Sequence, residues 1–99
     1  MQTNASNETL KVTGVTELTA LSAREVKENI TAAFSPELVN LDFDASQMEF
    51  LDSSGLGTLI SLQKLAALRN GSFRLISPTP SSIQILELTR LHRVFQIVS

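Results

Sequence analysis

Phe50-Leu51-Asp52-Ser53-Ser54-Gly55-Leu56-Gly57 continues directly into Thr58-Leu59-Ile60-Ser61-Leu62. The pattern predicts an acidic loop that leads into the first turns of an amphipathic helix. Asp52, Ser53 and Ser54 are all suited to cap that helix, because each side chain can accept a hydrogen bond from an unpaired backbone N–H group. A serine hydroxyl at a helix N-terminus, where anions are favoured, is also an accessible acceptor for modification.

Two glycines interrupt the start of this predicted helix. Gly55 and Gly57 each lower helix propensity by about 1 kcal/mol relative to alanine, so their presence indicates another demand. Without side chains they allow another surface, or a phosphate, to approach the backbone closely. A capped helix with a glycine-softened start explains the same residues without any site, and spacing alone favours that simpler interpretation.

The complete string Asp52-Ser53-Ser54-Gly55-Leu56-Gly57, between an apolar pair and an apolar helix, resembles the signature of STAS domains. Within that family it is most similar to the small free-standing anti-sigma factor antagonists of bacteria. There, the serine directly after the aspartate, here Ser53, is phosphorylated by a partner anti-sigma factor that is also a serine kinase. The resemblance therefore implies a phosphorylation site at Ser53. It also implies a partner-binding surface made of Asp52, Ser53, Ser54, Gly55, Leu56, Gly57, Thr58 and Ser61.

The function implied by this resemblance is binding without catalysis, cofactor or metal. The unphosphorylated chain is expected to bind an anti-sigma factor and so release a sigma factor, and phosphorylation of Ser53 is expected to break that complex. A serine phosphatase that resets Ser53 is a further expected partner. The chain itself is expected to be a monomer or a weak dimer.

The resemblance covers most of the chain. Asp44, eight residues before Asp52, matches an acidic or amide position of the family, and Leu88-Thr89-Arg90-Leu91 resembles its closing segment. Where the family often has Gly-x-Leu-Asp ahead of the first helix, this chain has Gly14-Val15-Thr16-Glu17, with a side chain one methylene longer than aspartate. Asp44 and Glu17 are therefore the expected supports of the phosphorylation site.

Composition sets limits on the class of protein. Ninety-nine residues with 42% hydrophobic and 18% charged side chains suit one globular domain with a modest core. The absence of cysteine excludes thiol catalysis, sulfur ligands and disulfides. No apolar run reaches transmembrane length, and residues 1–20 lack a basic start followed by an apolar segment, so a cytoplasmic location is expected.

The net charge of −2 is unevenly distributed. No lysine or arginine lies between Lys27 and Lys64, whereas six acidic residues fall there: Glu28, Glu37, Asp42, Asp44, Glu49 and Asp52. Nucleic acid is therefore not expected as a partner, since phosphate binding needs a basic surface. The acidic residues suit either a solvated rim or an electropositive protein partner, and both interpretations stay open.

Residues 1–8 are polar and expected to be flexible, which leaves residues 9–99 as the domain. Alternation around Leu10 and Val12 predicts a strand that is buried on one face. Ser22-Ala23-Arg24-Glu25 matches a capping box, with Leu21 and Val26 as a hydrophobic staple, and Ser35-Pro36 ends the predicted first helix.

Further along, alternation predicts a central strand over 38–43, and the helix of the signature is expected to span 53–69. Asn70-Gly71 suits a left-handed C-cap. A strand over 73–76, a helix from Thr79-Pro80 to about Arg90 and a strand over 94–98 complete the chain. This order predicts an α/β fold with a mixed, mainly parallel sheet of about four to five strands and helices packed on it. Functional loops then follow the C-terminal ends of strands, where Ser53 lies.

Two other functions remain as alternatives. Leu41-Asp42-Phe43-Asp44 resembles the Asp-x-Asp motif of haloacid-dehalogenase-type phosphatases, in which Asp52 would add a third oxygen ligand for Mg²⁺. The motif is short, however, and the chain is small for that fold. Some STAS domains instead serve lipid or anion transporters as interaction subunits without a phosphorylated serine, and the intact Asp52-Ser53-Ser54 favours the phosphorylation switch over that role.

Overall fold

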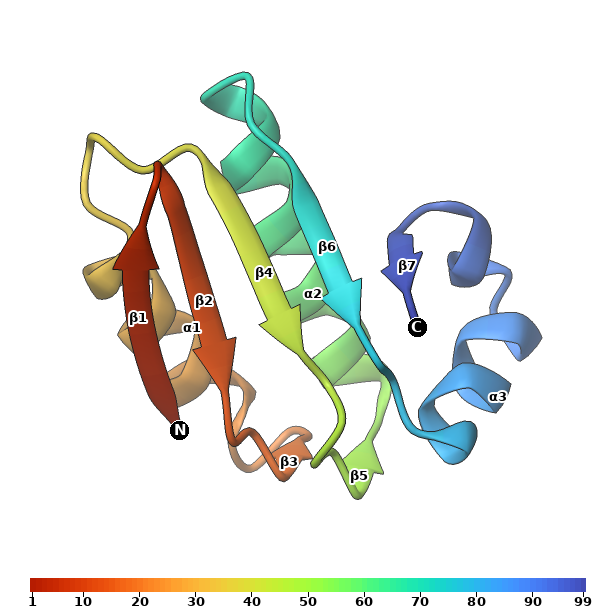
Figure 1. Cartoon of the computed structure of the whole chain (residues 1–99). Coiled ribbons are helices and arrows are strands. Elements are labelled where there is room, and N and C mark those ends of the chain that lie inside the picture. The colour runs from red at the N-terminus through yellow and green to blue at the C-terminus, as the bar shows by residue number, and fades with distance from the viewer.

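The computed structural model describes residues 1–99, and its main feature is a five-stranded mixed sheet in the order β1-β2-β4-β6-β7 (Figure 1). β1 is antiparallel to β2, and every other neighbouring pair in this sheet is parallel. The predicted α/β fold with a mainly parallel sheet is therefore confirmed. The strands are β1 (Gln2–Ser6), β2 (Thr9–Thr13), β4 (Asn40–Asp44), β6 (Phe73–Ile76) and β7 (Gln96–Val98).

Three α-helices connect these strands. α1 (Ala23–Ala33) and α2 (Ser53–Leu68) lie together behind the sheet in Figure 1, whereas α3 (Pro80–Leu88) lies at the side of β7. A short 3₁₀ helix, η1 (Leu91–Arg93), links α3 to the last strand. One face of the sheet is consequently covered by helices, and the other face is open.

The core lies between the sheet and the helices. β2, β4 and β6 each bury alternate residues, as strands with one covered face must. Phe43, Phe73 and Phe95 form two tilted ring pairs in the core, with Phe43 and Phe73 centroids 6.5 Å apart and Phe73 and Phe95 centroids 5.7 Å apart. The buried strand residues pack with residues of α1 and α2; the central members of this core are Leu10, Val12, Ile30, Phe34, Leu41, Leu59, Leu62 and Leu75.

The open face of the sheet is polar. Asp42 on β4 is aligned with Lys11 on β2 and with Arg74 on β6. The Arg74 guanidinium donates two hydrogen bonds to the Asp42 carboxylate, Nε to Oδ1 at 2.8 Å and Nη2 to Oδ2 at 2.7 Å. This bidentate pair raises the pKa of Arg74 and occupies both oxygens of Asp42.

The expectation of a flexible segment over residues 1–8 is wrong, because Gln2–Ser6 forms the edge strand β1. Its five residues pair in register with β2, from Gln2 opposite Thr13 to Ser6 opposite Thr9. Asn7 and Glu8, both with positive φ, make the tight turn between the two strands. All five strand residues are exposed, so no hydrophobic alternation marked them in the sequence.

Helix α1 begins where predicted, but the predicted capping hydrogen bonds and hydrophobic staple are not formed. Ser22 is the N-cap residue, but its side chain makes no capping hydrogen bond. The Ser22 hydroxyl instead accepts a bond from the Thr19 N–H at 3.1 Å and donates to the Glu17 carbonyl at 3.0 Å. Leu21 is almost fully exposed and forms no staple. The Ser22 hydroxyl is therefore hydrogen-bonded to the preceding loop and does not cap the helix.

The other predicted helix ends agree with the structure. The Thr79 hydroxyl accepts a bond from the Ser82 N–H at 3.2 Å, with Pro80 in the first turn. After α2 the chain reverses at Asn70, which has a left-handed φ of 58°. Arg69 then fastens this end of α2 to the exit of α1, because its Nη1 donates to the Ser35 and Leu38 carbonyls at 2.7 and 2.8 Å.

Candidate functional site

A two-stranded parallel ladder positions the loop that precedes α2. β3 (Glu17–Leu18) pairs with β5 (Phe50–Leu51), with Glu17 opposite Phe50 and Leu18 opposite Leu51. Backbone hydrogen bonds extend the ladder on both sides, from the Glu49 N–H to Thr16 at 2.8 Å and from the Asp52 N–H to Leu18 at 3.4 Å. The start of α2 is thereby held against the loop that follows β3, which the sequence pattern did not indicate.

Asp52 is the N-cap of α2, as predicted. Its Oδ1 accepts a hydrogen bond from the Gly55 N–H at 3.0 Å, which satisfies one of the free donors of the first turn. Its Oδ2 accepts a bond from the Ala20 N–H, also at 3.0 Å, in the loop between β3 and α1. One carboxylate therefore ties the helix start to a loop 32 residues earlier. The bonds from Gly55 and then Ala20 hold the pKa of Asp52 below its ordinary value.

The lowered pKa of Asp52 predicts a dependence of stability on pH. Because the folded-state pKa lies below the unfolded value, ionised Asp52 stabilises the domain above about pH 4, and this contribution is lost as the pH falls through the folded pKa. Asp52→Asn should lower the melting temperature at pH 7, and the difference from wild type should shrink towards pH 3. Thermal unfolding over that range measures it. A difference that stayed constant with pH would show that the charge of Asp52 is not involved.

Ser53 and Ser54 open α2 with their side chains exposed to solvent. Neither hydroxyl makes a hydrogen bond within the molecule, in contrast to Ser61, whose hydroxyl donates to the Gly57 carbonyl at 3.0 Å. Ser53 directly follows the capping Asp52, at the end of the helix where free N–H groups favour an anion. Its hydroxyl is therefore accessible and not committed to any other contact.

The predicted partner-binding residues divide into two groups. Asp52, Ser53, Ser54, Gly57 and Ser61 are at least partly accessible, whereas Gly55, Leu56 and Thr58 are buried. The side chains of Leu56 and Thr58, each 7% exposed, therefore offer little surface to a partner in this conformation, and the partner-binding role of the whole set stays a prediction. Gly55 shapes the site by its lack of a side chain, since a Cβ there would lie 1.9 Å from the Leu18 carbonyl oxygen.

The two expected supports of the phosphorylation site have other partners. The Glu17 carboxylate accepts a hydrogen bond from the Thr19 hydroxyl at 2.7 Å, and Asp44 accepts one from the Ser46 N–H at 2.9 Å. Hydrogen bonding by Ser46, from its side chain and its backbone, lowers the pKa of Asp44. No hydrogen bond joins Glu17 or Asp44 to Ser53. Their role at Ser53 stays a prediction.

The three aspartates of the phosphatase alternative do not form a metal site. Asp42 is paired with Arg74 on the open face, Asp44 binds Ser46, and Asp52 binds two backbone N–H groups. No group of three or more His, Cys, Asp or Glu side chains in the molecule is placed to hold a metal ion. This arrangement speaks against the Mg²⁺-dependent mechanism.

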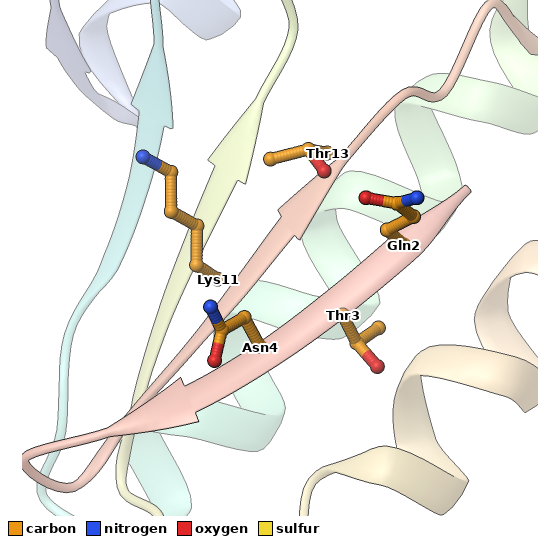
Figure 2. Close-up of a pocket in the computed structure, with 5 residues that line it drawn as sticks. All are labelled: Gln2, Thr3, Asn4, Lys11 and Thr13. Atoms are coloured by element: carbon orange, nitrogen blue, oxygen red, sulfur yellow. The ribbon is translucent and has the colours of Figure 1, made fainter.

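A polar hollow of about 500 Å³ lies over the hairpin of β1 and β2 (Figure 2). It is lined by residues of β1 and β2, with Lys11 beside Asn4 of the neighbouring strand. None of the predicted site residues contributes to it, and Lys11 is its only charged side chain. The hollow therefore follows from the polar surface of the β1–β2 hairpin and adds nothing to the Ser53 site.

The longest helix, α2, has 16 residues, and no helix in the structure is long and apolar enough to cross a membrane.

Comparisons with known proteins agree with this fold. The family profile described as STAS domain matches residues 1–99. A crystal structure from Thermotoga maritima, assigned as an anti-sigma factor antagonist, superposes with a TM-score of 0.90 at 23% identity, covering 99% of this chain and 85% of that chain. The anti-sigma factor antagonist SpoIIAA in its unphosphorylated form gives a TM-score of 0.76 at 19% identity, over 99% and 87% of the two chains. The phosphorylated form of Bacillus SpoIIAA gives 0.68 at 18% identity, over 99% and 90%.

Proposed function

The chain belongs to the STAS domain family, and on that premise we propose that it is an anti-sigma factor antagonist switched by phosphorylation of Ser53. Unphosphorylated, it binds an anti-sigma factor that is also a serine kinase, and so releases a sigma factor. Phosphorylation breaks the complex, and a serine phosphatase restores it. The domain acts by binding and carries out no catalysis of its own.

The observation that carries this proposal is the position of Ser53. Its hydroxyl is exposed, makes no hydrogen bond and lies at the first residue of a helix whose cap, Asp52, is fixed by two backbone N–H groups. A kinase can therefore reach the acceptor without unfolding the site. That SpoIIAA, a protein with the same fold, occurs in a phosphorylated and an unphosphorylated form also supports the proposal.

The effect of the phosphate follows from its charge. A phosphoserine carries about −1.5 to −2 charges at neutral pH, and a helix N-terminus favours them. The neighbouring carboxylate of Asp52 opposes that gain, so the fold should change little. A partner that covers the neutral hydroxyl would, however, have to desolvate the new charge beside an existing one, and buried charges without a partner are costly. The switch therefore acts at the interface.

Substitutions at Ser53 test the proposal. Ser53→Ala should fold, bind the anti-sigma factor as wild type does and resist phosphorylation. Ser53→Asp should fold but bind about a hundredfold more weakly, which corresponds to about 3 kcal/mol. Calorimetric titration with the anti-sigma factor kinase of the same organism gives the affinities, and thermal unfolding confirms that both variants are folded.

Ser54→Ala is the matched control, because Ser54 is the next residue and is also exposed. This variant should still be phosphorylated by the kinase and ATP. Mass spectrometry after the reaction locates the phosphate. Phosphate found on Ser54 in the wild-type chain, or on neither serine, would defeat the assignment to Ser53.

A further inference from the structure

Two large apolar side chains lie exposed on the two segments that are joined to the start of α2, the loop before α1 and strand β5. Leu21, in the loop before α1, is 92% exposed, and Phe50, on β5, is 61% exposed. The residue that follows Phe50, Leu51, packs against the core, so the strand places one apolar side chain inward and the other outward. Isolated exposed apolar residues are common on proteins and need no explanation. The placement of Leu21 and Phe50 beside the same loop, however, calls for an explanation.

Both residues are held in place by the backbone of the site. The Ala20 N–H binds Asp52 Oδ2, and the next N–H, that of Leu21, donates to the Thr19 hydroxyl at 3.3 Å. The Phe50 N–H donates to the Thr16 carbonyl at 3.3 Å, within the ladder that carries Asp52. The two segments are therefore fixed relative to the helix start. Side chains presented on an ordered backbone lose less entropy when a partner covers them.

The surroundings of this pair are acidic. Glu17 is aligned with Phe50 across the ladder, Glu49 precedes it and is exposed, and Asp52 follows two residues later. The closest basic residue after Leu21 in the sequence, Arg24, has its Nε 3.2 Å from Glu28 of its own helix. A complementary surface would combine an apolar centre with basic residues around it, as apolar cores with charged rims are usual at protein interfaces.

We propose that Leu21 and Phe50 are the apolar anchors of this interface, and that they dock on an apolar patch of the anti-sigma factor bordered by basic residues. This inference rests on the proposed function and assigns residues to it. Contact through these anchors would exclude water from the region of Ser53. The basic residues of that border would face Glu17 and Glu49, and a phosphate on Ser53 would be desolvated beside Asp52 without a basic partner of its own, so anchoring and switching share one surface.

Serine substitutions of the two anchors test the inference. Leu21→Ser and Phe50→Ser should each weaken binding of the purified anti-sigma factor kinase by about 10- to 100-fold, the range seen for central apolar anchors. Titrations contain a non-hydrolysable ATP analogue so that Ser53 stays unphosphorylated. Both variants should keep the wild-type melting temperature, because neither side chain is buried. Glu49→Gln should slow association and weaken its salt dependence.

Leu88→Ser is the matched control, because Leu88 is 78% exposed at the C-terminal end of α3, outside the two segments that carry the anchors (Figure 1). It should bind within about threefold of wild type. If wild type binds and both anchor variants bind equally well, the anchor assignment is overturned and the proposed function stands. A loss for Leu88→Ser as large as for the anchors also overturns the assignment. If wild type fails to bind, the inference and the proposed function both fall.

Discussion

Gly55→Ala should destabilise the domain by about 3 kcal/mol or more, at the upper end of the cost of overpacking. A Cβ at this position would lie 1.9 Å from the Leu18 carbonyl oxygen and 2.8 Å from the Leu18 carbonyl carbon. The same carbonyl oxygen accepts the Asp52 N–H, so it cannot move without breaking the contact that positions the cap. Relief of the clash must therefore separate the start of α2 from β3.

Gly57→Ala is the matched control for this substitution. Gly57 lies two residues later in the same helix, is exposed, and has no heavy atom within 4 Å of the position a Cβ would take. Alanine should therefore stabilise the helix by up to about 1 kcal/mol through its higher propensity. Urea unfolding of both variants measures the two effects, which should have opposite signs. Equal small changes would mean that the glycine at 55 serves no steric purpose.

Leu56→Ala should lower the free energy of unfolding by about 2–5 kcal/mol. Leu56 is the first large apolar residue of α2, is only 7% exposed and belongs to the core. Truncation removes buried apolar surface and leaves a cavity under the helix start. The backbone at Gly55 already lies close to the Leu18 carbonyl, so it cannot move in to fill that cavity. The substitution should thus affect the Ser53 site as well as global stability.

Leu68→Ala provides the comparison, because Leu68 ends the same helix and is 84% exposed. Its stability should stay within about 0.5 kcal/mol of wild type. Denaturant titrations followed by circular dichroism give the free energy of unfolding of both variants. A loss at Leu56 no larger than that at Leu68 would remove Leu56 from the core.

The sequence was informative wherever one face of an element is buried. Leu10 and Val12, or the apolar residues of α2, repeat with the period of their element, and this periodicity identified the parallel strands and the helices. β1 was missed because none of its residues is buried, and its stability comes from pairing with β2. Ser22 was misjudged for another reason. A local pattern does not reveal whether a hydroxyl faces the helix or the preceding loop.

The candidate site was predicted to a similar extent. The cap by Asp52 and the position of Ser53 follow from local sequence, since both depend on neighbours within one turn. The bond from Ala20 to Asp52 and the close approach of Leu18 to Gly55 join segments more than thirty residues apart. Such contacts arise from the β3–β5 pairing, two residues on each strand, which is too short to leave a periodic signal.

The order of the strands also has a consequence for the kinetics of folding. β1 and β2 are joined by a tight turn, so this hairpin can form within microseconds from local contacts. The parallel pairs require much longer chain closures: Thr9 and Asn40 lie 31 residues apart, and Asp42 and Arg74 lie 32 apart. Each closure costs entropy before its contacts form. We therefore expect the β1–β2 hairpin to form before the folding transition state. The pairing of β4 with β2 and β6 should form in the transition state itself.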